Sequence, residues 1–280
     1  MEPARKKPVV VYGASGYTGR LVCEYLREYG ITFIAAGRSR EKIAAALQSH
    51  VPGIETADCE IAEVAHTAEA LAALFQGASV VLNTVGPFTK LGFEVVQASL
   101  DARCHYLDTS SEQDWLITLD QEFGARFASA GLLLAPGVAQ MYTTCEIAAQ
   151  LCLETPGLDL LDIAVFLGGS PTIASTKTVL VQAAAGVKHA MPPRENPHIH
   201  RTLDSVHASG LLGHAHCVIR GSCNYKQTGL LQAFAAHWLL QIPPRRTGFA
   251  SGCQAFGHRE LLGALRSFGL VQAPQLSVHA

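Results

Sequence analysis

Apolar positions in the first half of the chain fall into short continuous runs, and the segments between them carry apolar residues at helical spacing. The pattern predicts strands at 8–13, 31–37, 53–59, 79–88, 104–110 and 132–137, and helices over 19–30, 39–50, 67–77, 92–102 and 112–131. Strands that are apolar throughout are typical of a parallel sheet buried on both faces. We therefore expect an α/β fold with a doubly wound parallel Rossmann sheet, strand order 3-2-1-4-5-6, and a ligand crevice at the carboxyl ends of strands 1 and 4.

The regular alternation ends after about residue 138. Beyond it, the pattern predicts a helix over 141–157, a strand over 158–171, a helical or mixed piece over 172–187, a strand over 213–229, and helices over 230–241 and 258–268. The Pro- and His-rich stretch 191–210 is predicted to interrupt regular structure. We therefore expect this half of the chain to form a smaller α+β unit.

Composition and charge narrow the class of protein. The 280-residue chain has a mean hydropathy of +0.20 but no run of about 18 apolar residues, so no transmembrane segment is expected. A net charge of -2 provides no basic surface for nucleic acid. The eight cysteines form no Cys-x-x-Cys pair, which indicates free thiols in a reducing compartment. Because no signal-type apolar run follows the basic N-terminus, we expect a cytoplasmic protein.

Three glycines, Gly13, Gly16 and Gly19, follow the first predicted strand and open the first predicted helix. In this context the first glycine allows a tight turn, the second lets a pyrophosphate approach the backbone, and the third lets the helix pack closely on the strand. The free N–H groups at the helix start would then face an anion. Further donors are expected from Ser15, Tyr17 and Thr18. The spacing GxxGxxG thus predicts a dinucleotide site, with a glycine-rich turn that binds nothing as the alternative.

The end of the second predicted strand indicates which dinucleotide binds. An NAD(H) site usually has Asp or Glu there to accept from the ribose hydroxyls, whereas this chain has Arg38 and Ser39, with Lys42 close by. Arg38 and Ser39 are suited to a 2′-phosphate through charge-assisted hydrogen bonds. NADP(H) is therefore favoured over NAD(H), unless the arginine only marks a solvated helix start.

Four motifs together resemble the saccharopine dehydrogenase-like oxidoreductases: VYGASGYTGRL (11–21), AGRSREK (36–42), NTVGPF (83–88) and CHYLDTSSE (104–112). The resemblance implies that three further strand ends line the dinucleotide. The residues it places there are Asp58 and Cys59 near the adenine, Asn83, Val85, Gly86 and Pro87 along the dinucleotide, Phe88 towards the nicotinamide, and Asp108 at the crevice. For Asn83 and Asp108, capping of their own loops is an equally weighted alternative.

The resemblance also implies a division of the chain. Residues 8–138 together with about 246–280 would form the dinucleotide-binding Rossmann domain, since the tail 251–270 resembles the family's return to that domain. Residues from about 139 to 245 would form an inserted substrate and dimerisation domain, shorter than in the family. A homodimer through this domain is expected on the same ground.

The expected activity is that of an NADP(H)-dependent oxidoreductase. Hydride would move between the nicotinamide C4 and a carbon bearing an amine or hydroxyl in a small substrate that the sequence does not name. No catalytic acid or base is assigned, because none of the seven tyrosines has a lysine four residues on and the segment PGVAQMYTTC (136–145) departs from the family. The alternative is a non-catalytic dinucleotide-binding protein, either a sensor or a subunit of an assembly. Two His-x-His pairs, at 198/200 and 214/216, lack a third ligand at suitable spacing, so no metal site is expected.

Overall fold

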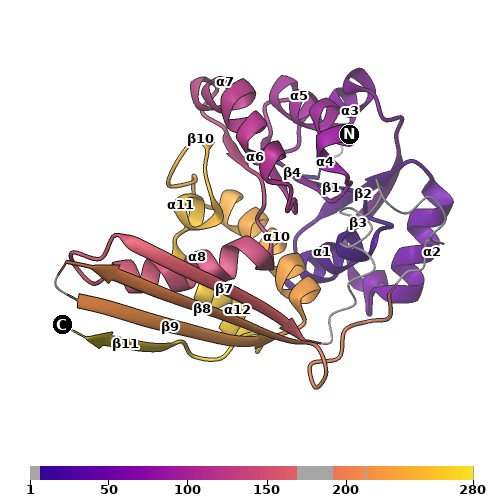
Figure 1. Cartoon of the computed structure of the whole chain (residues 1–280). Coiled ribbons are helices and arrows are strands. Elements are labelled where there is room, and N and C mark those ends of the chain that lie inside the picture. The colour runs from indigo at the N-terminus through magenta and orange to yellow at the C-terminus, as the bar shows by residue number, and fades with distance from the viewer. Residues whose placement is uncertain (1–6, 169–191, 212, 280) are drawn as a thin grey trace, which may run out of the picture.

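The computed structural model describes residues 7–168, 192–211 and 213–279. Seven parallel strands form the larger sheet, in the order β10-β6-β5-β4-β1-β2-β3 (Figure 1). Their bounds are β1 Val9–Tyr12, β2 Phe33–Gly37, β3 Cys59–Glu63, β4 Val80–Asn83, β5 His105–Asp108, β6 Leu133–Ala135 and β10 Gly248–Phe249. The predicted Rossmann order 3-2-1-4-5-6 is confirmed, and β10 adds a seventh strand beside β6.

Helices cover both faces of this sheet. They are α1 Tyr17–Glu28, α2 Arg40–His50, α3 Ala68–Phe75, α4 Phe88–Leu91, α5 Phe93–Asp101, α6 Gln113–Leu119 and α7 Ala125–Ser129, with a 3₁₀ turn at Ile54–Thr56 and a π-helical turn at Asp120–Gly124. Because successive strand residues point to opposite faces, Val9 and Val11 join one hydrophobic cluster while Val10 and Tyr12 join the other. Burial on both faces explains why the strands read as continuous apolar runs.

A second, antiparallel sheet has the order β11-β9-β8-β7 and lies beside the first unit, with α8 and α10 between the two sheets (Figure 1). Its strands are β7 Leu160–Gly168, β8 Arg201–Gly210, β9 Gly213–Ser222 and β11 Gln275–His279. The accompanying helices are α8 Gln140–Leu153, α10 Asn224–Leu239, α11 Gly252–Phe256 and α12 His258–Ser267. The α+β character expected for this half is confirmed.

Two details of this half differ from the sequence predictions. The stretch predicted to interrupt regular structure contains β8, because Thr202, Asp204 and Val206 alternate inward with a period of two that the preceding prolines obscured. The segment 246–280 supplies β10 to the first sheet and β11 to the second, while the predicted domain boundaries stay a prediction. The piece predicted over 172–187 lies outside the described residues.

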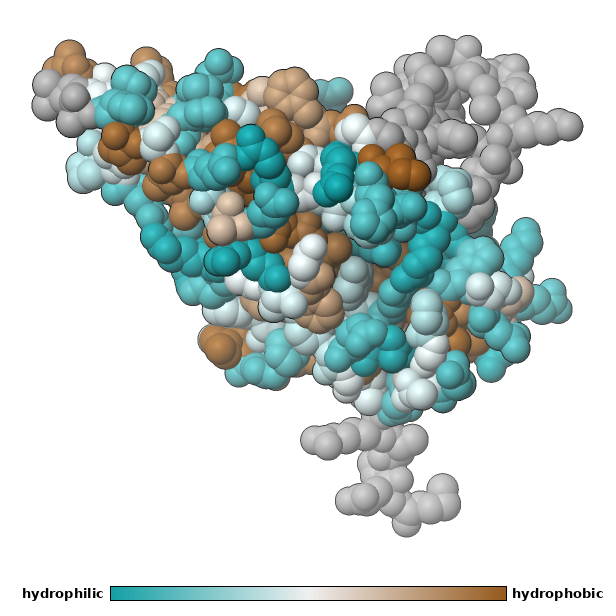
Figure 2. Space-filling model, turned by 90° about the horizontal axis from the view of Figure 1, so that it is seen from below, coloured by the Kyte–Doolittle hydropathy of each residue, from teal (hydrophilic) through white to brown (hydrophobic). Residues whose placement is uncertain are grey.

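The outer strands of the second sheet expose several apolar side chains. Leu160 and Phe166 on β7 are 67% and 59% exposed, and Val278 on β11 is 49% exposed. Seen from below, apolar side chains are interspersed with polar ones over the molecule (Figure 2). On β7 the exposed apolar side chains also include Leu161, Ile163 and Leu167.

Candidate functional site

The crevice at the carboxyl edge of the larger sheet begins with the glycine loop between β1 and α1. Gly13 has φ +94° and donates its N–H to the Ala36 carbonyl at 2.9 Å, and a Cβ there would lie 2.6 Å from Thr84 Oγ1. A Cβ on Gly19 would overlap the Gly13 carbonyl oxygen. Gly13 and Gly19 are thus required by the fold of the loop itself. Gly16 is less constrained, because a Cβ there would meet only the Gly13 oxygen, at 3.2 Å.

The first turn of α1 offers backbone donors. Gly16 is the N-cap residue and supplies no side-chain acceptor, and the first turn contains no acidic residue. Within the described part of the chain, the half-buried side chains of Ser15 and Thr18 make no hydrogen bond. A helix N-terminus left uncapped in this way carries free N–H groups and a positive dipole end, which suit a phosphate.

Tyr17 contributes to this turn only through its backbone. Its hydroxyl donates to the Pro193 carbonyl at 2.9 Å, and its ring meets the Tyr225 ring edge-on at 5.0 Å. The side chain is buried, and burial raises the pKa of Tyr17 to about 12. The phenol therefore joins α1 to the second half of the chain, and the expectation of a side-chain donor to a ligand has no support in its position.

Arg38 stands directly after β2, at the crevice edge. It is exposed, and among the residues the structure describes it makes no hydrogen bond or ion pair. Ser39 caps α2, its Oγ accepting from the Lys42 N–H at 3.3 Å, while the Arg40 N–H donates to Glu63 Oε2 at 2.9 Å. Glu63 at this edge is thus already occupied, and Arg38 remains available to a negatively charged group.

The loop after β4 faces the glycine loop and is shaped by its own side chains. The Val85 N–H donates to Asn83 Oδ1 at 3.0 Å, and the Asn83 amide donates to the Tyr106 hydroxyl at 3.0 Å. Val85, Gly86 and Pro87 keep part of their surface exposed along the crevice. Phe88 is 6% exposed and packs in the hydrophobic cluster, so its ring is part of the core and does not reach towards a nicotinamide.

Asp108, at the end of β5, is fully buried and surrounded by donors. Its carboxylate accepts from Trp115 Nε1 at 2.8 Å, the Gly137 N–H at 2.8 Å, the Ser110 N–H at 3.0 Å and the Tyr106 hydroxyl at 3.0 Å. Burial raises the pKa of Asp108, and the Trp115 hydrogen bond opposes that rise most. The carboxylate therefore ties together the loops that end β5 and β6, which matches the loop-capping alternative.

Asp58 and Cys59 were predicted to end strand 3, and this placement is wrong. Residues 54–56 form a 3₁₀ turn, and β3 begins at Cys59, which pairs in parallel with Phe33. Both residues therefore lie at the amino edge of the sheet, opposite the crevice, where Asp58 forms an ion pair with Lys7. Ile54 and Ala57 pack against the core from the 3₁₀ turn and the residues after it, and the strand itself buries Ile61 and Ala62.

The true carboxyl end of β3 leads to residues that the sequence did not single out. Tyr12 is the last residue of β1. Its hydroxyl lies 2.8 Å from His66 Nδ1, and the two rings are stacked. His66 Nε2 in turn lies 3.6 Å from Glu94 Oε2. Burial raises the pKa of Tyr12, and the Arg38 charge opposes this rise. The position of His66 just before the Thr67 helix cap was the available signal.

A buried polar cluster lies where α8 meets β8. Asp204 is 1% exposed, and among the described residues neither of its carboxylate oxygens has a hydrogen-bond partner. Burial raises the pKa of Asp204 to about 7, and Thr144 and Gln140 on α8 lower it only in part. Gln140 follows the loop after β6. Its backbone N–H donates to Thr228 Oγ1 at 3.1 Å, and its side-chain amide donates to Thr144 Oγ1 at 3.1 Å. The sequence signal for Asp204 is its position two residues after Thr202, because alternate residues of a strand face the same side.

No group of three His, Cys, Asp or Glu side chains among the described residues could hold a metal ion. His200 Nδ1 accepts from the Asn196 N–H, and His216 stacks on His207 with centroids 3.8 Å apart. None of the eight cysteines is in a disulfide. His200, His207 and His216 thus each contact a neighbouring side chain or backbone group.

Residues 9–130 match the family model described as the saccharopine dehydrogenase NADP binding domain. The resemblance predicted from the four motifs is thereby confirmed for this part of the chain. A second model, described as a family of unknown function (DUF5938), matches residues 143–187 and 179–280. In the part of the chain that the structure describes, no helix has the length and apolar character needed to cross a membrane.

Two curated relatives each match less than half of the chain. A "lipid droplet localized protein" of Caenorhabditis elegans is 34% identical over 132 residues, which cover 44% of this chain and 31% of that protein. A "trans-acting enoyl reductase" of Mycobacterium tuberculosis is 36% identical over 117 residues, which cover 40% of this chain and 27% of that protein. The matched region thus spans about a third of the length of these relatives.

The fold likeness extends further than the sequence likeness. Apo saccharopine dehydrogenase (L-Glu forming) of Saccharomyces cerevisiae superimposes with a TM-score of 0.61, covering 97% of this chain and 100% of that chain at 10% identity. At this identity the superposition supports the fold alone. It includes the second sheet, so both halves of the chain follow that architecture.

Proposed function

We propose that the crevice binds NADP(H) and that the protein is an NADP(H)-dependent oxidoreductase. The single observation that supports this best is the combination of an uncapped α1 N-terminus with an exposed Arg38 after the next strand, which has no partner among the described residues. The match of residues 9–130 to an NADP binding domain agrees with it. The relatives named as enoyl reductases support the oxidoreductase class.

Each part of the crevice has a separate task in this proposal. The backbone N–H groups of the first turn of α1 would hold the pyrophosphate, with Gly16 leaving room for it. Arg38 would pair with the 2′-phosphate, and the Ser39 hydroxyl, whose oxygen already accepts from Lys42, would donate to it. The backbone of Val85, Gly86 and Pro87 would line the dinucleotide opposite the glycine loop. Asp108 and Asn83 would act indirectly, by holding the loops in place.

When bound, the nicotinamide supplies hydride chemistry at its C4 atom. We propose a small substrate that gives or accepts this hydride at a carbon bearing an amine or hydroxyl. Gln140, which follows the loop after β6, and Asp204 on β8 form a buried polar region beside α8. A homodimer and a cytoplasmic location stay predictions.

Arg38→Ala tests the cofactor half of this proposal. We expect wild-type protein to bind NADPH more tightly than NADH in calorimetric titrations. The substitution should weaken NADPH binding by about 10- to 100-fold and leave NADH binding nearly unchanged, because a charge-assisted contact contributes about 1.5–3 kcal/mol. Arg40→Ala is the matched control, since the Arg40 side chain bonds to the Ile61 carbonyl. Equal affinities for the two dinucleotides would contradict the assignment of Arg38.

Turnover separates the oxidoreductase from the non-catalytic alternative. NADPH consumption would be followed by absorbance with ketones, with 2-oxo acids plus an amino acid, and with enoyl thioesters. Acceleration by one class supports the enzyme and identifies its substrate type. Tight NADPH binding with no consumption in any arm would support the sensor or assembly subunit instead.

A further inference from the structure

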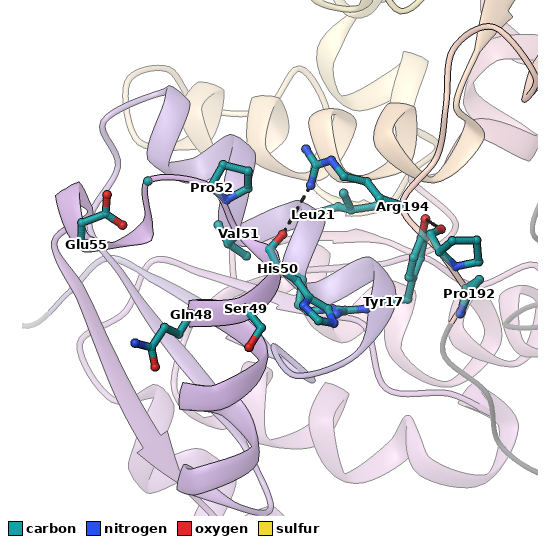
Figure 3. A pocket seen from close by; sticks show the side chains of 13 residues that line it. Tyr17, Leu21, Gln48, Ser49, His50, Val51, Pro52, Glu55, Pro192 and Arg194 are labelled. Atoms are coloured by element: carbon teal, nitrogen blue, oxygen red, sulfur yellow. Dashed lines mark hydrogen bonds between the residues drawn. The ribbon is translucent and has the colours of Figure 1, made fainter.

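A cavity of about 560 Å³ lies outside the dinucleotide crevice. Its walls come from the first turns of α1, the carboxyl end of α2 with the following turn, and the segment 192–194 (Figure 3). Because α2 starts at the carboxyl end of β2 and runs back along the sheet, its last residues lie away from the crevice edge. The cavity is therefore a separate site, although it shares the start of α1 with the crevice.

Arg20 supplies a buried positive charge to this cavity. The residue is 5% exposed, and burial lowers the pKa of its guanidinium. Its contacts are a hydrogen bond from Nε to the Gly16 carbonyl at 3.3 Å and a stacking contact of Cζ on the Tyr17 ring at 5.6 Å. Among the described residues no carboxylate pairs with it. A buried charge is costly unless it is paired, so an anion bound in the cavity would stabilise this guanidinium.

Two acidic side chains near the cavity, Glu24 and Glu195, are engaged elsewhere, and a third, Glu55, lies apart from Arg194. Glu24 binds Arg194 through both guanidinium nitrogens, at 2.8 and 2.5 Å. Glu195 accepts from the Tyr225 and Lys226 N–H groups at the start of α10. Glu55 lies at the far end of the cavity from Tyr17 and Arg194 (Figure 3). None of them neutralises Arg20.

Arg194 adds a second cation on the facing wall. Its guanidinium is held by Glu24 and by the His50 carbonyl, at 3.4 Å, and its charge further lowers the pKa of Arg20. Because Arg194 is already paired with Glu24, Arg20 is the main source of positive potential at this end of the cavity. The walls also carry apolar surface from Leu21, Val51 and Pro193. Charge at one end and apolar walls beside it are the features of a site for a small organic ligand.

We propose that this cavity binds a small organic anion whose carboxylate or phosphate group pairs with Arg20. The planar guanidinium matches either oxyanion in a two-point contact. The volume lies within the range of pockets for small molecules, about 300–1,000 Å³. The site would act independently of the dinucleotide, whose 2′-phosphate is assigned to Arg38.

The test uses citrate and inorganic phosphate as probes of the two oxyanion types. Thermal unfolding of the full-length protein is measured with each anion up to 50 mM, at constant ionic strength balanced with chloride, and with saturating NADPH present or absent. We expect a saturable rise in the unfolding temperature that persists with NADPH and disappears in Arg20→Gln. Arg266→Gln, at an exposed position on α12, is the matched control and should keep the full rise.

Two further results decide the outcome. Arg20→Gln without anion should be at least as stable as wild type, because it removes an unpaired buried charge. Arg194→Gln changes a partly exposed residue and should weaken the anion-dependent rise in unfolding temperature several-fold. It keeps the test possible if Arg20→Gln fails to fold. No anion-dependent rise in wild type, or an equal rise in Arg20→Gln, would overturn the proposal. A rise that NADPH abolishes would place the anion in the crevice and would also overturn it.

Discussion

Asp108→Ala is expected to lower the free energy of unfolding by about 3–5 kcal/mol, because it leaves buried donors without an acceptor. The Asp108 carboxylate accepts from Trp115, Tyr106, Ser110 and Gly137, and its own carbonyl accepts from Gln232 Nε2 at 2.8 Å. Through Tyr106 the network continues to Asn83 and the loop after β4. Loss of the carboxylate should therefore loosen both walls of the crevice.

Urea unfolding followed by circular dichroism measures this effect. Asp159→Ala, which removes an exposed aspartate before β7, is the control and should change the free energy of unfolding by less than about 0.5 kcal/mol. We also expect NADPH binding to weaken in Asp108→Ala, since Asn83 loses its fixed position. A loss of stability below about 1 kcal/mol would mean that the donors find water and that Asp108 does not organise the crevice.

Asp204→Asn is expected to stabilise the protein, and to do so more at high pH. The carboxyl has a reference pKa of 3.8 and a folded-state pKa of about 7. Below pH 3.8 it is protonated in both states and carries no penalty. As pH rises towards 7 the unfolded state releases its proton first, so the folded state loses up to about 4 kcal/mol, and this loss is complete above pH 7. Asparagine has no such titration.

Unfolding free energies at pH 5 and pH 8 test this directly. The gain from Asp204→Asn over wild type should be about 2–3 kcal/mol larger at pH 8 than at pH 5. Asp162→Asn, at an exposed position on β7, should give the same small change at both pH values. An equal effect of Asp204→Asn at the two pH values would show that the carboxyl is ionised throughout, with water or another donor as its partner.

The crevice could be predicted where its signal is local. The glycine loop and Arg38 follow strands whose apolar runs are continuous, so the sequence places them at the carboxyl edge of the sheet without further information. The cap residues Ser39 and Thr67 were readable for the same reason, since capping depends on residues three positions apart. Placing Asp58 failed because the short β3 offers only a weak apolar pattern, Cys59–Glu63 being half polar.

Other features depend on contacts between distant segments. The Tyr17 side chain turns to Pro193, which lies 176 positions away, and no local pattern indicates this. Asp204 and Arg20 are buried by packing between elements that are distant in the sequence. Their residue types can be read from the sequence, but this packing cannot. The family resemblance placed Phe88 towards the nicotinamide, whereas the Phe88 ring packs in the hydrophobic cluster. Burial of single side chains is thus what the sequence left open.

The central claim is that a dinucleotide binds at the glycine loop, and an amide NMR map of the protein with and without NADPH tests it most directly. The account predicts the largest shift changes at residues 13–19, 37–39 and 84–88, with little change at Gln48–Gly53. Saturable changes confined to residues 48–53 and 192–194, or no changes at millimolar NADPH, would contradict it.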